Sequence, residues 1–215
     1  MIDDQAALPV VLALAALFLG WYILGNELMR RRARRLALWC KRAVDPLGGQ
    51  QAVRWLTLQS FRLELDALNQ PFERGTITGL VESWDVPLIW IWNRRRGRRD
   101  MVLLQIVLRR QPLWGFELYR PGSLLAGDAR HVAADEGWSE SALDEFRLCL
   151  PGPGAAALPN ALLAELDTYR SNLVRLAVRR RDIHLTLALN VPDPAGFGPD
   201  RFADLVGRLA RAIVA

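Results

Sequence analysis

The longest apolar run of the chain extends over residues 6–25 and contains no side chain that is charged at neutral pH. A helix rises about 1.5 Å per residue, so about 20 residues cross a hydrocarbon layer of about 30 Å. The run is apolar on every face, which disfavours a core helix with one polar side. Trp21 and Tyr22 stand near its C-terminal end, where aromatic rings favour the boundary between membrane and water. The pattern predicts a transmembrane helix, and the residues assigned to this anchor are Ala6, Leu12, Leu17, Trp21, Tyr22 and Gly25.

Charges on the two sides of this run predict its orientation. Residues 1–5 include Asp3 and Asp4, whereas arginines follow the run almost at once. A signal peptide has the reverse order, with basic residues before the apolar stretch and a small-residue cleavage site after it. Basic flanks stay on the cytoplasmic side, so residues 1–5 are predicted to form a short extracytoplasmic tail. We therefore expect a single-pass protein of the bacterial inner (plasma) membrane, with its N-terminus outside and its C-terminal domain cytoplasmic.

Residues 26–46 are predicted to continue the helix beyond the membrane as a basic juxtamembrane segment. Arginine favours helices, and apolar residues recur there at helical spacing, namely Ala33, Leu36, Cys40, Ala43 and Val44. Pro46 and the pair Gly48-Gly49 then provide a stop signal. Five arginines form the cluster that follows the anchor: Arg30, Arg31, Arg32, Arg34 and Arg35.

Strand patterns follow the two glycines. Apolar and polar residues alternate over 61–66, which is typical of a half-buried strand, and a second strand is expected around 76–82. Residues 101–108 form a short run that is apolar on both faces, which predicts a central strand. Residues 116–118 are expected to form its neighbour, and residues 145–150 show a further alternating strand.

Helices and a hairpin are predicted to close the chain. Residues 158–169 and a segment that begins at Pro199 have the spacing of amphipathic helices. Between them, residues 174–189 have the pattern of a hairpin with a tight connection at Arg180-Arg181. Because helices are grouped after strands, we expect an α+β fold for the cytoplasmic domain, residues 47–215, with a largely antiparallel sheet packed by two C-terminal helices.

A group of tryptophans beside arginines is the one local feature that indicates a function. Its members are Trp84, Trp90, Trp92, Arg94, Arg95, Arg96, Arg98 and Arg99. Indoles at headgroup depth and guanidinium groups on phosphates suit an element that lies in the membrane interface. Two other interpretations stay open. In one the tryptophans pack under the sheet beside a solvated arginine turn, and in the other they dock on a second membrane subunit, since Trp and Arg are common interface anchors.

The net charge of the chain is +5, from 28 basic and 23 acidic side chains. Residues 30–42 and 94–99 together carry more positive charge than that, so the rest of the chain is acidic overall. A nucleic-acid-binding domain has its basic residues spread over one face of the fold instead. We therefore expect no nucleic-acid partner, and the expected partners are membrane lipid and a membrane protein subunit.

Neither histidine has the sequence neighbours of a metal ligand. His131 falls in residues 127–141, which we expect to form an acidic surface loop, and His184 falls on the polar side of a strand. Both are therefore expected at the surface, and no metal site is predicted.

Signatures of catalysis are equally missing from the sequence. No nucleophile elbow, phosphate loop or Cys-x-x-Cys pair occurs, and Cys40 and Cys149 are isolated, which predicts no disulfide. The acidic residues Glu64, Asp66 and Glu82 are expected to face solvent rather than to form an acid–base pair. We expect no catalytic residue, no cofactor and no small-molecule substrate.

The function predicted from these observations is binding. The first hypothesis is an accessory or assembly subunit of a larger membrane protein complex. The alternative is an anionic-lipid-binding or membrane-organising module that belongs to no stable complex. An enzyme with a pocket near the membrane is the least favoured class, because the sequence indicates no gathering of titratable groups.

Overall fold

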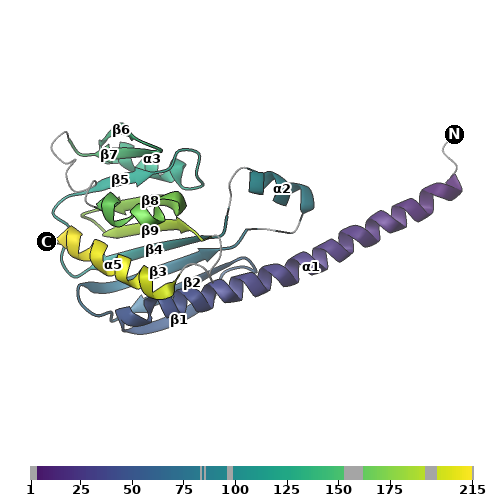
Figure 1. Ribbon diagram of the computed structural model, residues 1–215, viewed down its shortest axis with the longest axis horizontal. Coiled ribbons are helices and arrows are strands. Elements are labelled where there is room, and N and C mark those ends of the chain that lie inside the picture. The colour runs from purple at the N-terminus through teal and green to yellow at the C-terminus, as the bar shows by residue number, and fades with distance from the viewer. Residues whose placement is uncertain are drawn as a thin grey trace.

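The computed structural model describes residues 4–82, 84, 86–95, 99–152, 162–191 and 198–214. Within them the chain has an α+β architecture, with one long N-terminal helix, an open antiparallel sheet of nine strands, and C-terminal helices (Figure 1). The elements of the first half are α1 (Asp4–Val44), η1 (Asp45–Leu47), β1 (Gln50–Trp55), β2 (Ser60–Asp66), β3 (Phe72–Leu80), α2 (Pro87–Arg95) and β4 (Met101–Leu108). Those of the second half are β5 (Phe116–Tyr119), α3 (Ala126–Asp135), β6 (Ser139–Leu143), β7 (Phe146–Leu150), η2 (Asp167–Asn172), β8 (Leu173–Val178), β9 (Leu185–Asn190) and α5 (Pro199–Val214).

The N-terminal half of α1 projects from the rest of the molecule as a rod (Figure 1). Its side chains from residue 8 to residue 20 are exposed on all sides. The candidate span Leu8–Leu47, which comprises most of α1 and η1, contains a stretch of mean hydropathy 2.2 of which only 6% is buried, so it is long and apolar enough to cross a membrane. The predicted long apolar helix is therefore confirmed.

The C-terminal half of α1 is part of the hydrophobic core. One stripe of this half is buried, formed by Met29, Ala33, Leu36, Trp39, Cys40, Ala43 and Val44. The stripe lies against β2, β3 and α5, and the Trp39 ring meets the Phe202 ring edge-on with centroids 5.4 Å apart. The predicted continuation of the helix to Val44 is confirmed, and the helix ends where Pro46 and Gly48 were expected to stop it. Gly48 has a φ of 72°, a left-handed conformation that glycine adopts without strain.

The strand order in the sheet is β1-β2-β3-β4-β9-β8-β5-β7-β6, and every neighbouring pair is antiparallel. β4 lies between β3 and β9, so the interior position predicted for its apolar run is confirmed. The prediction that residues 116–118 form the neighbouring strand was wrong, because β9 and β8 lie between β4 and β5. A hairpin from much later in the chain is inserted there, and local alternation carries no information about which distant strand pairs with which.

The two faces of the sheet are covered differently. One face is packed by the C-terminal half of α1, by α5 and by the segment around Leu162 and Leu166, which together enclose the main core. On the other face, α3 packs near the β6 edge of the sheet, where its alanines contact Tyr119 of β5 and Cys149 of β7. The described part of the predicted helix 158–169 begins at Leu162, and residues 158–161 lie outside the described residues. The hairpin β8–β9 and the final helix from Pro199 are confirmed.

Residues 127–141 do not form the loop that the sequence predicted. They contain most of α3 and the start of β6, and Ala126, Ala129 and Ala133 pack against Tyr119 and Cys149. The helix was missed because its buried side is made of alanines, which give little contrast with the polar positions.

His184 was also predicted wrongly, since it is buried. Its Nδ1 accepts a hydrogen bond from the backbone N–H of Leu108 at 2.9 Å. The imidazole therefore pairs with the last backbone N–H of β4. A strand-to-strand contact of this kind depends on sheet pairing and is invisible in the local sequence pattern.

A substitution at Leu36 can test whether the juxtamembrane half of α1 belongs to the core. Leu36→Ala is expected to lower the free energy of unfolding by about 2–5 kcal/mol, because the side chain is fully buried against the sheet. Leu38→Ala is the matched control on the same helix; Leu38 is 58% exposed, and we expect a change below about 0.5 kcal/mol. Urea unfolding of the full chain in detergent micelles, followed by near-UV circular dichroism, measures both. Equal effects of the two substitutions would contradict the packing described here.

Candidate functional site

One end of the sheet lies where α1 leaves the globular part of the molecule, and we call it the junction end. Strand register defines it: Trp55 is opposite Phe61, Ser60 is opposite Leu80, and Met101 is opposite both Leu80 and Asn190. The chain therefore turns at this end between β1 and β2, and passes through α2 between β3 and β4. Figure 1 shows α2 beside α1, beyond the edge of the sheet.

The segment between β3 and β4 is attached to α1 through the backbone of Trp84. The Trp21 indole N–H donates to the Trp84 carbonyl oxygen at 2.9 Å, and the Trp84 N–H donates to the Met29 sulfur at 3.2 Å. Between these contacts, a Cβ on Gly25 would lie 2.9 Å from the same carbonyl oxygen. Trp21, Gly25 and Met29 are four residues apart and share one helix face. Glycine at position 25 thus allows the two backbones to approach closely.

A buried acidic residue joins α1 to the sheet close to this contact. Asp100 is 3% exposed, and its carboxylate pairs with the Arg32 guanidinium at 2.9 Å. The other carboxylate oxygen of Asp100 accepts the backbone N–H of Glu82 at 2.9 Å. The guanidinium of Arg32 also lies 5.4 Å from the centre of the Trp84 ring. One carboxylate therefore binds α1 and the ends of β3 and β4 together.

Glu82 is buried, which contradicts its predicted solvent exposure, whereas Glu64 and Asp66 are exposed as expected. Its nearest cation is Arg94 of α2, whose Nη1 is 3.7 Å from the carboxylate. Burial raises the pKa of Glu82, and the charge of Arg94 opposes this rise in part. Glu82 lies beyond the end of β3 at Leu80, so the alternation of side chains along this strand does not determine which way it faces.

The Trp84 ring packs against the Trp90 ring of α2, with centroids 4.8 Å apart and the two planes tilted by 44°. The Arg94 guanidinium lies 5.8 Å from the centre of the Trp90 ring, so aromatic and cationic groups form successive layers. Trp92 is on another side of the helix and is 58% exposed. Arg95 is exposed as well. The three tryptophans of the predicted group therefore differ: two hold α2 in place and the third faces outward.

The turn between β1 and β2 forms the second part of the junction end. Trp55, Leu56 and Leu58 are each nearly half exposed there. Trp55 and Leu58 border a hollow of about 300 Å³ together with Thr57 and with Arg30 and Arg34 of α1. A helix turns by about 100° per residue, so Arg30 and Arg34 project from a different face of α1 than the one that meets Trp84.

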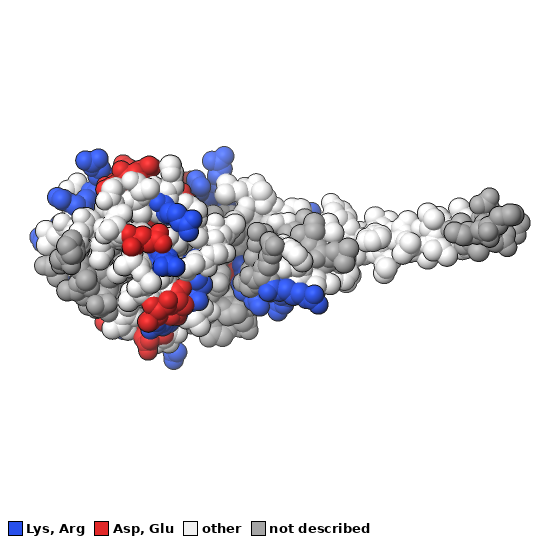
Figure 2. All heavy atoms as spheres, turned by 90° about the horizontal axis from the view of Figure 1, so that it is seen from above, with Lys and Arg blue, Asp and Glu red and all other residues white. Residues whose placement is uncertain are grey.

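These two parts form what we call the junction surface, made of Arg30, Arg34, Trp55, Leu56, Leu58, Val86, Ile91, Trp92, Arg94 and Arg95. Six of its members are exposed large apolar side chains, and four are arginines. Figure 2 shows basic side chains gathered where the rod joins the globular part, and none along the visible described part of the outer rod. An exposed surface that mixes apolar and basic groups is typical of a contact with another molecule or with a membrane.

The structure distributes the residues predicted for this site over several environments. Arg31 pairs with Glu27 at 2.8 Å, Arg35 is exposed elsewhere on α1, and Arg99 donates to the carbonyl oxygen of Arg94. Of the anchor, Leu12, Leu17 and Tyr22 are exposed, whereas Gly25 is buried. Arg96, Arg98 and the side chain of Ala6 lie outside the described residues.

Sequence reasoning missed the turn with Trp55, Leu56 and Leu58. A signal was present, because two leucines in a tight turn between strands are unusual in a solvated loop. It also missed Asp100, whose importance depends on a partner far away in the sequence. Among the residues that the structure describes, no group of three or more His, Cys, Asp or Glu side chains is arranged to hold a metal ion.

Comparison with known proteins does not identify a relative of this chain. No family model matches the sequence, and no curated protein matches it.

A substitution at Arg32 can test whether its ion pair with Asp100 attaches α1 to the sheet. Arg32→Gln is expected to lower the free energy of unfolding by about 3 kcal/mol, since it leaves the buried Asp100 carboxylate without its cation. Arg31→Gln removes the same charge one residue earlier from an exposed pair, and we expect a change below about 1 kcal/mol. Denaturant titration of both variants in micelles measures the difference. If Arg31→Gln destabilised the protein as much as Arg32→Gln, the Asp100 contact would not be the attachment.

Because the pKa of Glu82 is raised, we predict that the free energy of unfolding depends on pH. Its raised pKa means that the folded chain holds the proton more tightly than the unfolded chain does. The free energy of unfolding therefore falls as the pH rises from the ordinary Glu value of 4.5 through the raised value. Glu82→Gln is expected to remove this fall, so its stability relative to wild type increases between pH 4 and pH 7. Glu64→Gln, at an exposed position, serves as the control, and an identical pH profile for both variants would refute the assignment.

Proposed function

We propose that this chain is a single-pass protein of the bacterial plasma membrane, and that its C-terminal domain acts by binding, with the junction surface lying on the lipid headgroups of the cytoplasmic leaflet. One observation supports the proposal above all. The exposed apolar and basic side chains of the junction surface belong to the same end of the domain from which the apolar half of α1 departs.

The depth of these groups fits the membrane interface. If residues 6–25 span the hydrocarbon, Trp21 and Gly25 lie at its edge, and α2 is attached to α1 at that level. Trp92 is then at headgroup depth, where indole rings are favoured. Arg94 and Arg95 lie beside it, within reach of lipid phosphates, and each basic residue near an anionic surface contributes about 1 kcal/mol.

The β1–β2 turn supports the same arrangement on another side of α1. Trp55 and Leu58 present apolar atoms, and Arg30 and Arg34 present cations in the same hollow. Amphipathic elements of this composition bind the interface through buried apolar area and attraction to anionic lipid. With contacts on two sides of α1, the domain is held at one height and one orientation.

A second candidate function is an accessory or assembly subunit of a larger membrane complex. Trp55 and Trp92 favour it, because exposed tryptophans beside arginines are common anchors of protein interfaces. In that case a partner subunit covers the junction surface, and lipid does not.

Spin labels at the two parts of the junction surface distinguish membrane contact from exposure to water. We expect nitroxides attached at Leu58→Cys and at Trp92→Cys, in full-length protein in anionic nanodiscs, to be accessible to oxygen and protected from a water-soluble nickel chelate. Leu113→Cys is the control, since Leu113 is exposed at the opposite end of the sheet. The native thiols Cys40 and Cys149 do not compete, because both are buried and burial raises their pKa values, that of Cys149 to about 11.

Three labels with equal access to the nickel chelate would contradict membrane contact. The subunit function is tested separately, by purification of a C-terminally tagged chain from native membranes in mild detergent. A partner at near-equal stoichiometry that protects the label at Trp92→Cys would favour the second candidate over lipid contact.

A further inference from the structure

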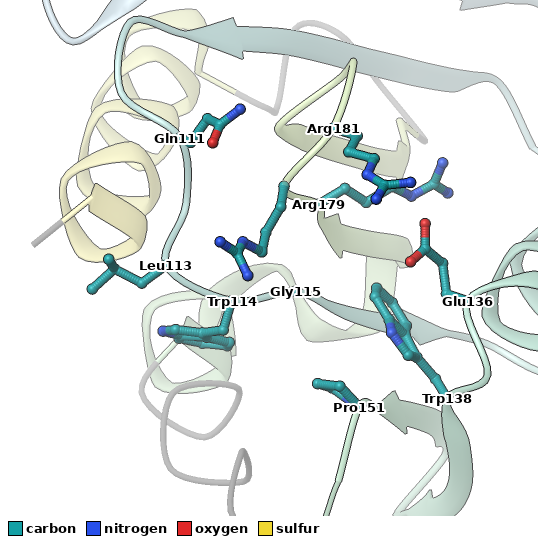
Figure 3. A pocket seen from close by; sticks show the side chains of 10 residues that line it. Gln111, Leu113, Trp114, Gly115, Glu136, Trp138, Pro151, Arg179 and Arg181 are labelled. Atoms are coloured by element: carbon teal, nitrogen blue, oxygen red, sulfur yellow. The ribbon is translucent and has the colours of Figure 1, made fainter.

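A second concave surface lies at the end of the sheet opposite the junction end, and we call it the distal pocket. Figure 3 shows it from close by. It has a volume of about 480 Å³, which lies within the usual range for small-molecule sites. Strand register places it: Val178, which ends β8, is opposite Phe116 and Leu185, and Leu185 is opposite Ile106 in the last part of β4. The connection from β8 to β9 and the approach to β5 therefore meet at this end.

Two tryptophans border the distal pocket. A Cβ on Gly115 would lie 3.1 Å from the Trp138 ring, so the absence of a side chain lets this indole lie close to the backbone. Trp114 stacks on Phe116 at 5.9 Å with the two planes 28° apart, which holds its ring in place. Both indoles are partly exposed, and Figure 3 shows them on either side of Gly115. They offer flat apolar surfaces to a ligand.

Three consecutive arginines form the opposite side of the distal pocket. The Arg179 Nη2 donates to the Glu117 carboxylate at 3.1 Å, and Glu117 is fully buried. That carboxylate also binds Arg175, so one fixed anion orients Arg179. The Nε of Arg179 is buried without a hydrogen-bond partner among the described residues. Arg180 and Arg181 are exposed, and in the described part of the chain neither has an ion pair.

We propose that the distal pocket binds a soluble organic phosphate that carries a planar ring, of about the size of a nucleoside monophosphate. Guanidinium groups hold phosphate oxygens by paired hydrogen bonds, and Arg180 and Arg181 are available for this. A planar ring stacks on Trp138, which Gly115 allows to lie close to the backbone. The Glu136 carboxylate, which points toward the arginines in Figure 3, accepts a hydrogen bond from a ring amino group or a sugar hydroxyl.

The ligand is soluble because the distal pocket lies across the sheet from the junction surface. The solubility of the ligand rests on the proposed function, because a domain whose junction end lies on the membrane turns the distal pocket toward the solution. Lipid phosphates are then out of reach of Arg180 and Arg181. The chemical fit of the pocket does not depend on the membrane.

Calorimetric titration of the full chain in nanodiscs of zwitterionic lipid tests the proposal, with AMP, adenosine and inorganic phosphate as probes. We expect AMP to bind saturably with one site per chain. Adenosine and inorganic phosphate each supply half of the contacts, so each should bind at least tenfold more weakly. The double variant Arg180→Gln/Arg181→Gln should weaken AMP binding at least tenfold.

The matched control is the double variant Arg42→Gln/Arg54→Gln, which removes the same charge from exposed positions outside both surfaces and should leave AMP affinity unchanged. Trp138→Leu should weaken AMP binding and leave phosphate binding unaltered, which separates stacking from charge. The proposal is overturned if AMP shows no saturable binding at millimolar concentration, if adenosine binds as tightly as AMP, or if both arginine pairs have equal effects. Because no anionic lipid is present, failure here leaves the spin-label result unaffected.

Discussion

The burial of one stripe of α1 against the sheet determines how the rest of this molecule is arranged. Leu36, Cys40 and Ala43 are completely buried, although they belong to the same continuous helix as the exposed apolar rod. A helix of this kind transmits its direction along its whole length, because its backbone hydrogen bonds leave little freedom within it. The rod and the globular domain are therefore connected by one continuous helix. The contact between Arg32 and Asp100 strengthens this attachment at the point where the helix leaves the sheet.

Antiparallel pairing then places two different surfaces at the two ends of one sheet. Each chain reversal falls at one end or the other, so the β1–β2 turn and α2 lie with the outgoing helix, whereas the β8–β9 turn lies away from it. The junction end combines exposed apolar side chains with arginines, and the distal end combines arginines with two indoles around a hollow. An extended mixed surface suits an extended partner such as a membrane, and a hollow of larger volume suits a small molecule.

Buried carboxylates support both surfaces in the same way. Asp100 and Glu82 lie beneath the junction surface, and Glu117 lies beneath the distal pocket. Each has at least one arginine as its counter-charge, since an unpaired buried charge would strongly destabilise the fold. Asp100 and Glu117, at 2.9 Å and 3.1 Å from the guanidinium groups of Arg32 and Arg179, thereby restrict two long and otherwise flexible side chains. The remaining arginines of each cluster stay exposed and available for external anions.

The sequence by itself determined the elements whose signal is local. Length and uniform apolarity predicted the long helix, alternation predicted β2 and β7, and helical spacing predicted α5. Where prediction from the sequence failed, the reasons are also physical. The alanine-lined α3 had too little contrast to be recognised, and the pattern around residues 127–141 gave a loop instead. Only the tertiary structure decided that β9 and β8 separate β4 from β5, that His184 and Glu82 are buried, and that Trp55 joins Trp92 at one end of the sheet. These outcomes depend on which distant strands pair, and the free energy of that choice comes from the whole core rather than from any segment alone.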